Sequence, residues 1–354
     1  MQHEQQVEVD REEIHGCDEQ YQQTSRPWIS RSAQDARVLR LFLILVIACG
    51  GAARRPTTSI AAARVLDHRG ELVAARTELS HALADARGDR VASAELLAEL
   101  ARLAGTEALA TNAGYVEGIA EAREAQQAAR AAGARHALPV AIDAEGMLHY
   151  AHKLWAGAVD FAVPRAAFER AVAAYRAAGD AVGIAEATFH VGLTYEQEGD
   201  LSTASTYYRH ALEARDDAIT AYAERHLAGI AADRGDLASA RRGFTRSLAL
   251  REQLGFARLV PAAHIAIANI DLQEGAIDAA LVRYRRALAL ATQIGHPLGL
   301  LWAHLALGGG LEKSGAREEA LEHYQTALAL AAKTRVTIGI AAAKAAIEHA
   351  RSGS

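Results

Sequence analysis

The chain has 354 residues, a formal net charge of −5 and 51% hydrophobic residues, so its length allows two globular domains or one long repeat array. Only 5% of the residues are aromatic and six are proline, whereas alanine is frequent throughout. This composition favours an all-α protein whose helices pack closely through small side chains. A mildly acidic chain without a clustered lysine and arginine surface is not expected to bind nucleic acid.

An apolar run of eight residues, LFLILVIA, extends from Leu41 to Ala48 and follows Arg37 and Arg40. It is too short to span a bilayer, which requires about 20 residues in a helix. Its length, its preceding arginines and the small residues at its end fit the core of a secretory signal. The alternative is that the run forms part of a buried helix.

The apolar run ends with Val46, Ile47 and Ala48, and Cys49 follows directly. These four residues resemble the lipobox of a bacterial lipoprotein signal. The resemblance implies a diacylglyceryl group on the Cys49 thiol, cleavage just before Cys49 and an anchor in the cell envelope. We therefore assign residues 38–48 to a signal segment and 49–57 to a linker. If the resemblance is coincidental, Cys49 is an inert core thiol.

Residues 1–40 contain eight acidic residues and five arginines, whereas the leading part of a secretory signal is short and positive. We expect residues 1–37 to be disordered or to precede the true start of the protein, near Val38. The other cysteine, Cys17, lies in this stretch. Two cysteines cannot form a disulfide framework, and neither has histidines at metal-ligand spacing.

Internal repeats dominate the second half of the chain, where four glycine turns recur at spacings of 36, 40 and 40 residues. The turns are Gly199-Asp200, Gly235-Asp236, Gly275-Ala276 and Gly315-Ala316. Five residues after each glycine stands an alanine: Ala204, Ala240, Ala280 and Ala320. Nine residues after it stands an aromatic residue: Tyr208, Phe244, Tyr284 and Tyr324. Seven residues before it stands a small residue: Gly192, Ala228, Ala268 and Gly308.

These columns resemble the tetratricopeptide repeat, which implies an α-solenoid of antiparallel helix pairs. In each repeat the glycine ends the first helix, the small residues allow close helix packing, and the aromatic ring fills the space between repeats. Phe168 lies 40 residues before Tyr208 and marks the second helix of a further repeat, whose first helix we place at 140–156. We predict a regular array over 159–350 and degenerate helical repeats over 58–158.

Two glycines, Gly309 and Gly310, fall outside the columns and weaken their predicted helix by roughly 1 kcal/mol each relative to alanine. A close contact of the helix backbone is the explanation that we favour for them. A hinge in the helix is the alternative.

The resemblance also implies a binding surface, because first helices line the concave face of such superhelices. Transferring the inward-facing columns to this sequence gives nine candidates for contact with a partner, and they form a largely apolar track suited to a peptide. They are Glu186, Phe189, Leu193, Tyr222, Arg225, Ile265, Asn269, Trp302 and Leu305. For any one of them, packing against the neighbouring repeat is the alternative.

No phosphate-binding loop, nucleophile elbow or kinase motif is present, so we expect neither an enzyme nor a cofactor or small-molecule substrate. The histidine pairs His149/His152 and His264/His304 have no third ligand at suitable spacing, so no metal site is expected. We predict a lipid-anchored scaffold of the bacterial cell envelope that binds proteins or peptides. A cytoplasmic peptide-sensing regulator and the repeat tail of a larger enzyme are the alternatives.

Overall fold

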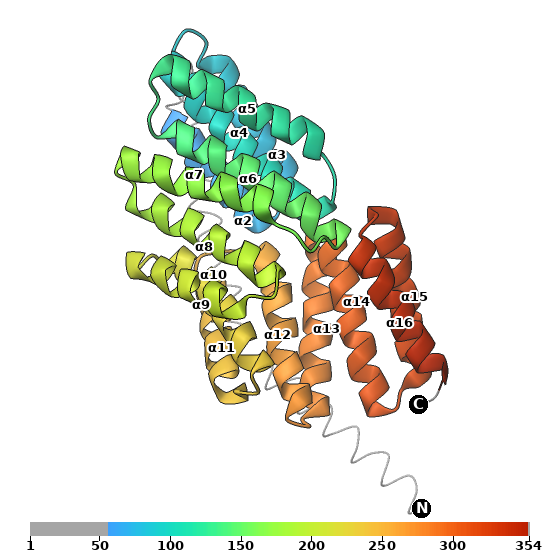
Figure 1. Cartoon of the computed structure of the whole chain (residues 1–354). Helices are drawn as coiled ribbons and strands as arrows, with labels where there is room; N and C mark the ends of the chain where they lie inside the picture. The colour runs from blue at the N-terminus through green and yellow to red at the C-terminus, as the bar shows by residue number, and fades with distance from the viewer. Residues whose placement is uncertain (1–55, 353–354) are drawn as a thin grey trace, which may run out of the picture. The chain divides into compact units, whose positions relative to one another are not determined.

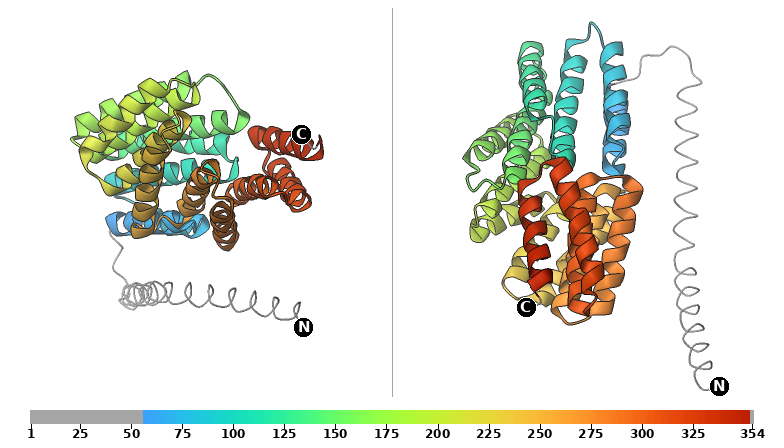
Figure 2. Two further views of the ribbon diagram at one scale, coloured as in Figure 1. Left: turned by 90° about the horizontal axis from the view of Figure 1, so that it is seen from below. Right: turned by 90° about the vertical axis from the view of Figure 1, so that its right-hand side faces the viewer.

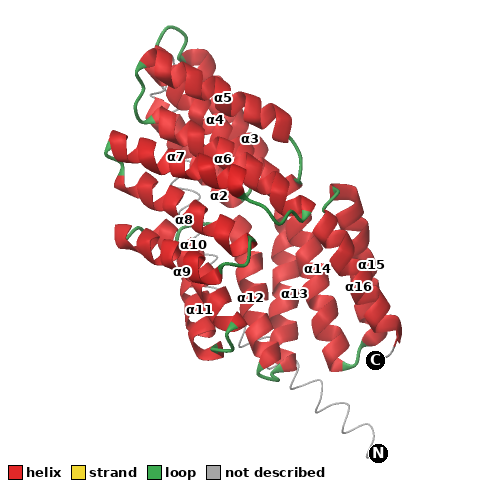
Figure 3. Cartoon of the chain, in the orientation of Figure 1, coloured by secondary structure: helices red, strands yellow, loops and turns green. Residues whose placement is uncertain are grey.

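The computed structural model describes residues 56–352, and every regular element in that range is a helix (Figures 1 and 3). The all-α prediction is thereby confirmed. The elements are α2 (Pro56–Arg69), α3 (Leu72–Asp85), α4 (Arg90–Thr111), α5 (Tyr115–Ala132), α6 (Ala137–Ala156), α7 (Ala162–Ala178), α8 (Ala181–Gln197), α9 (Leu201–Ala211), η1 (Leu212–Ala214), α10 (Asp217–Asp233), α11 (Leu237–Gln253), η2 (Ala257–Leu259), α12 (Val260–Gln273), α13 (Ile277–Ile294), α14 (Pro297–Ser314), α15 (Arg317–Thr334) and α16 (Thr337–Ser352).

Consecutive helices pack against each other, so the chain forms successive pairs from α2/α3 to α14/α15, followed by α16, and α4 also packs extensively on α6. All described residues belong to one compact unit. The boundary predicted between degenerate and regular repeats, at 158/159, falls in the connection between α6 and α7. The signal segment 38–48 and Cys49 lie outside the described residues, and α2 begins at Pro56, within the predicted linker.

The dipeptide Gly199-Asp200 shows how one helix ends and the next begins. Gly199 has a φ of +85°, which lets the Gly199 N–H donate to the Glu196 carbonyl at 3.0 Å while the Asp200 N–H donates to the Tyr195 carbonyl at 2.9 Å. The Asp200 carboxylate then accepts the Thr203 N–H at 3.0 Å, which caps α9. Positive φ at the other three turn glycines confirms the four predicted turns.

The repeat columns form the core between helices. All four column alanines have no exposed surface, and the column rings are between 0% and 7% exposed. A Cβ atom added at Gly192 would lie 2.7 Å from the Tyr208 ring, and one added at Gly308 would lie 2.5 Å from the Tyr324 ring. Glycine in α8 and α14 is therefore required by the close approach of a tyrosine from the second helix.

The two additional glycines of α14 have different surroundings. A Cβ atom at Gly310 would lie 2.9 Å from the Tyr284 ring, so close contact explains this glycine. At Gly309 the nearest atom is the Tyr324 hydroxyl oxygen at 3.8 Å, which is an ordinary contact. Our explanation by close contact is therefore correct for Gly310 and wrong for Gly309.

The two ends of the helix array meet. First helices that are five pairs apart contact each other, namely α4 with α14 and α6 with α16, and α2 contacts η2 (Figure 2). Asn112 at the end of α4 donates from its amide Nδ2 to the Thr334 carbonyl at the end of α15, at 2.8 Å. The solenoid is thus wound tightly enough to bring its N-terminal and C-terminal helices together.

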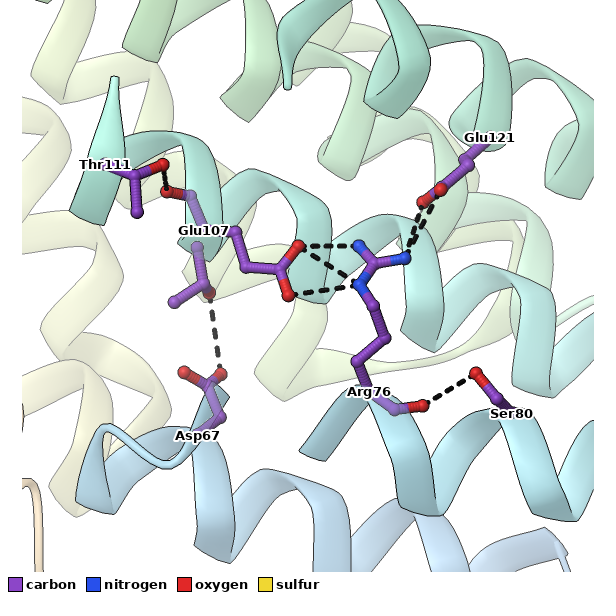
Figure 4. Close-up of polar contacts among 7 residues, drawn as sticks. Asp67, Arg76, Ser80, Glu107, Thr111 and Glu121 are labelled. Carbon is purple, nitrogen blue, oxygen red and sulfur yellow. Dashed lines mark hydrogen bonds and ion pairs between the residues drawn. The ribbon is translucent and has the colours of Figure 1, made fainter. Parts of the chain in front are cut away.

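The N-terminal pairs are joined by ion pairs as well as by apolar packing. The Arg76 guanidinium of α3 binds the Glu107 carboxylate of α4 at 2.7 Å and the Glu121 carboxylate of α5 at 3.3 Å (Figure 4). These contacts connect three helices in the region of degenerate columns. Within residues 56–352, no helix is both long and apolar enough to cross a membrane.

Substitution of the glycines in α14 tests the packing constraint. We expect Gly308→Ala to destabilise the protein by about 1–3 kcal/mol, because its methyl group overlaps the Tyr324 ring. Gly309→Ala has room and should stabilise the helix by up to about 1 kcal/mol. Urea unfolding followed by circular dichroism measures both changes. A Gly308→Ala protein as stable as the wild type would contradict the constraint.

The N-cap of α14 makes stability depend on pH. The His296 Nδ1 accepts the Gly299 N–H at 3.1 Å, which requires an unprotonated nitrogen. Burial, together with the nearby Arg258, lowers the His296 pKa to about 4. As the pH falls, His296 therefore takes up a proton in the unfolded chain before it does so in the folded protein. The stability that the cap contributes is complete above about pH 6.5 and is lost as the pH falls toward 4.

We expect His296→Asn to flatten the pH dependence of unfolding between pH 6.5 and 4, because asparagine keeps the acceptor without titrating. One proton accounts for a slope of at most about 1.4 kcal/mol per pH unit. Unfolding free energies measured across this range provide the comparison, and the exposed His81→Asn is the control. Equal slopes for the His296 and His81 variants would disprove this origin.

Candidate functional site

The nine candidate residues lie on the first helices α8, α10, α12 and α14, as the repeat pattern requires. Their exposure differs. Phe189 is 4% exposed and Leu193 is 7% exposed, so these two side chains contribute mainly to the core. Asn269 is exposed, and its Oδ1 accepts the Tyr284 hydroxyl at 2.6 Å. The other candidates are half-buried: Glu186, Tyr222, Arg225, Ile265, Trp302 and Leu305. Whether a partner contacts any of them stays a prediction.

An aromatic cluster occupies the α8 and α10 part of this face. The Phe189 ring lies 5.3 Å from the Tyr208 ring and 5.8 Å from the Tyr222 ring, between centroids. Tyr222 continues the cluster to Phe256, at 5.9 Å, in the turn before η2. Phe189 therefore supports the surface from beneath, while the partly exposed Tyr222 ring forms part of the surface itself.

The N-terminal helices complete the same face from the opposite side. The His68 ring of α2 lies 4.1 Å from the Phe256 ring, and the Trp155 indole of α6 stacks on Trp302 of α14 at 6.5 Å. The columns did not reveal these residues, because the contacts join helix pairs that are far apart in the sequence. No local sequence pattern around His68 or Trp155 indicates their partners.

Charged residues of α2 and α4 add a buried ionic network near this face. Glu99, which is almost fully buried, binds Arg64 and also binds Arg102 at 2.8 Å. Arg102 binds Asp67 at 2.9 Å, and Asp67 also lies 3.7 Å from Arg258 of η2. The network connects the first two repeats to the turn that precedes α12.

The Glu186 carboxyl of α8 lies beside this network. Burial raises its pKa, and the neighbouring Asp143 adds to the rise, while His190, Arg102 and Arg64 oppose it. His190 Nδ1 lies 3.0 Å from the Asp143 carboxylate. Burial by itself lowers the His190 pKa, but Asp143 and Glu186 outweigh it, so the His190 pKa is raised. Glu186 therefore accepts a proton more readily than a free glutamate.

A cavity of about 610 Å³ lies between α7, α8, α9 and η1, and none of the nine candidates lines it. Within the described part of the chain, no group of three or more histidine, cysteine or acidic side chains is arranged to hold a metal. His304 instead places its Nδ1 2.8 Å from the Nδ1 of His323, and His152 packs on Tyr115.

The helix pairs, the glycine turns and the buried ring columns define a class of protein, the α-solenoid of tetratricopeptide type. No family model matches the chain, and no match is found among curated proteins.

Solved structures show the same class. The Rap protein complexed with Competence and Sporulation Factor is 12% identical with a TM-score of 0.51, over 84% of this chain and 98% of that one. The APC/C hetero-tetramer Cut9-Hcn1 is 14% identical with a TM-score of 0.58, and the match covers 86% of this chain and 51% of that one. A STAND protein with a tetratricopeptide repeat sensor from Pyrococcus horikoshii is 14% identical with a TM-score of 0.50, and the match covers 79% of this chain and 43% of that one. At these identities the similarity establishes the fold.

The stacked indoles provide a test of the contact between the two ends of the array. We expect Trp155→Leu and Trp302→Leu to interact in a double-mutant cycle by about 0.5–1.5 kcal/mol, as aromatic pairs do. Unfolding followed by circular dichroism gives the four free energies, because tryptophan fluorescence changes with the substitutions. Additive effects would show that the two indoles do not stack on each other in solution.

Proposed function

We propose that this protein is a non-enzymatic interaction protein that binds a peptide or protein segment on its concave face. The observation that carries the proposal is the row of half-buried side chains on α10, α12 and α14, in which Tyr222, Ile265, Trp302 and Leu305 supply apolar surface and Arg225 supplies charge. Such a row suits an extended or helical peptide with apolar anchors. The proposal involves no cofactor, metal or small-molecule substrate.

Two solved structures support this use of the fold, because they are described as complexes. The Rap protein is bound to Competence and Sporulation Factor, and Cut9 is assembled with Hcn1. A face that already contains partly exposed aromatic and aliphatic side chains can gain further apolar burial when a partner binds, at about 25 cal/mol for each Å² removed from water.

A matched pair of substitutions tests the concave face. Peptides selected by display against the wild-type protein should lose at least about tenfold in affinity with Leu305→Glu, because a charge replaces an apolar anchor. Val282→Glu is the control, since Val282 is 61% exposed on the second helix α13. Isothermal calorimetry measures both affinities. Equal losses for the two variants, or none for either, would contradict binding on the concave face.

We further propose that the protein is anchored to the bacterial cell envelope through a lipid on Cys49. The support is the sequence Val46-Ile47-Ala48-Cys49 after an apolar run. Cys49→Ala should move the protein out of the membrane fraction, and metabolic labelling with a fatty acid should mark only the wild type. A Cys49→Ala protein that stays entirely in the membrane fraction would contradict the anchor.

The second candidate is a cytoplasmic regulator that senses a signalling peptide. The observation that favours it is the similarity to a Rap protein bound to a factor and to a tetratricopeptide repeat sensor. The two candidates differ in where the array resides. A reporter fused at residue 60 that is active only in the cytoplasm would support the regulator and exclude the envelope scaffold.

A further inference from the structure

The second helix α9 is shorter than its counterparts in the other regular repeats. It has 11 residues, whereas α11, α13 and α15 have 17, 18 and 18. The turn spacing after Gly199 is accordingly 36 residues, whereas the next two spacings are 40. After α9 the chain forms η1 and then turns away at Arg215, whose φ is +54°. The last turn of the second helix is therefore missing from this repeat.

In the α14/α15 repeat that turn covers the beginning of the first helix. The position 16 residues after the turn glycine holds Ala291 in α13 and Ala331 in α15, and neither alanine has exposed surface. Ala331 belongs to the same core cluster as Leu298 and Leu301, which lie near the start of α14. The corresponding residue of the α8/α9 repeat is Arg215, which is exposed. The beginning of α8 is therefore left uncovered between α7 and α9.

The cavity of about 610 Å³ lies at this place, between α7, α8, α9 and η1. A helical turn is 5.4 Å long and about 10–12 Å wide with its side chains, so it occupies roughly 400–600 Å³. The cavity is therefore large enough to hold about one helical turn. Its apolar lining comes from α7 and from the beginning of α8: Val172, Ala181, Ile184, Ala185 and Val191.

The cavity and the concave face lie on different sides of α8. Ile184 and Thr188, which line the cavity, are four residues apart and share one side of the helix. The candidate residues Glu186 and Leu193 are seven residues apart and share another side. At about 100° per residue these two sides are roughly opposite. A ligand in the cavity therefore does not occupy the concave face.

The walls of the cavity carry charged side chains without partners. Glu169 and Arg176 belong to α7, and Glu213 belongs to η1 on the opposite wall. None of these three side chains makes a hydrogen bond or an ion pair with another residue of the range 56–352. Arg176 and Glu213, although opposite in charge, are thus not within ion-pair distance of each other. Tyr207 and His210 of α9 complete the polar lining. The walls therefore present two carboxylates and one guanidinium to a ligand.

We propose that this cavity is a second docking surface, which takes a short basic amphipathic helix of a partner protein. The occupant is a helix because a helical turn fills the equivalent place in the α14/α15 repeat. Its apolar residues, three or four positions apart, cover Val172 and Ile184 and remove their side chains from water. Its lysine or arginine residues face Glu169 and Glu213, which outnumber Arg176 on the walls. The array therefore has one docking surface on each side of α8.

Three short synthetic peptides, each held helical by a hydrocarbon staple, test the cavity. The first has leucines three and four residues apart on one side and lysines on its flanks. The second has the same composition with the leucines distributed around the helix, and the third has glutamate in place of lysine. The wild-type chain should bind the first peptide at least about tenfold more tightly than either of the others. Fluorescence anisotropy measures the affinities, and equal binding of all three peptides would overturn the inference.

One substitution on each side of α8 then locates the bound peptide. Ile184→Glu places a carboxylate in the apolar lining and should weaken binding of the first peptide by at least about tenfold. Leu305→Glu introduces the same charge on the concave face and should leave this affinity unchanged. A loss for Leu305→Glu, or none for Ile184→Glu, would place the peptide outside the cavity. That result would overturn the second surface and leave the proposed function standing.

The exposed Glu213 provides a second variant in case Ile184→Glu does not fold. Glu213→Lys should reduce the preference for the lysine peptide over the glutamate peptide by at least about threefold, because it reverses a charge on the wall. An unchanged preference would overturn the inference. Analytical ultracentrifugation without peptide tests the other possible occupant, a second copy of this chain. Self-association that either variant abolishes would assign the cavity to an interface between copies and overturn the partner helix.

Discussion

The structure depends on the packing of one aromatic ring against one small residue in every regular repeat. The ring from the second helix lies where a larger residue on the first helix would clash, as Tyr208 does against Gly192 and Tyr324 against Gly308. This contact sets how closely the two helices approach. Because the same contact recurs along the chain, helix pairs of similar geometry follow one another, and their stacking forms the solenoid.

The path of the solenoid brings the two ends of the array together. As a result, residues from both ends cover part of the concave face. In an open solenoid the first helices face solvent. Here the first helices of the N-terminal pairs supply partners for the C-terminal ones, such as Trp155 for Trp302 and Asp67 for Arg258. The exposed part of this face is therefore a mixture of aromatic and charged groups, bounded by residues from both halves of the sequence.

The sequence was sufficient to predict the structural features that recur in each regular repeat. The spacing of glycine, alanine and aromatic residues predicted the turns and the buried rings, because these contacts lie within one repeat or between adjacent ones. Contacts across the superhelix, such as that of His68 with Phe256, depend on the small rotation between successive repeats, which accumulates over five repeats. A local sequence pattern does not predict this accumulated rotation. The burial of Phe189 stayed open, as the alternative to contact with a partner, because a column indicates a helix face but not what covers it.

The hydrogen bond between Asn112 and Thr334 joins residues that are 222 positions apart. During synthesis at about 5–20 residues per second, the α4 end of that contact emerges roughly 10–40 seconds before its partner exists. The early helices must therefore remain folded on nearest-neighbour contacts alone, with the concave side of α4 and α6 uncovered. The closed face is consequently a late product of translation, and a chaperone or partner present on the ribosome meets an open spiral rather than the finished molecule.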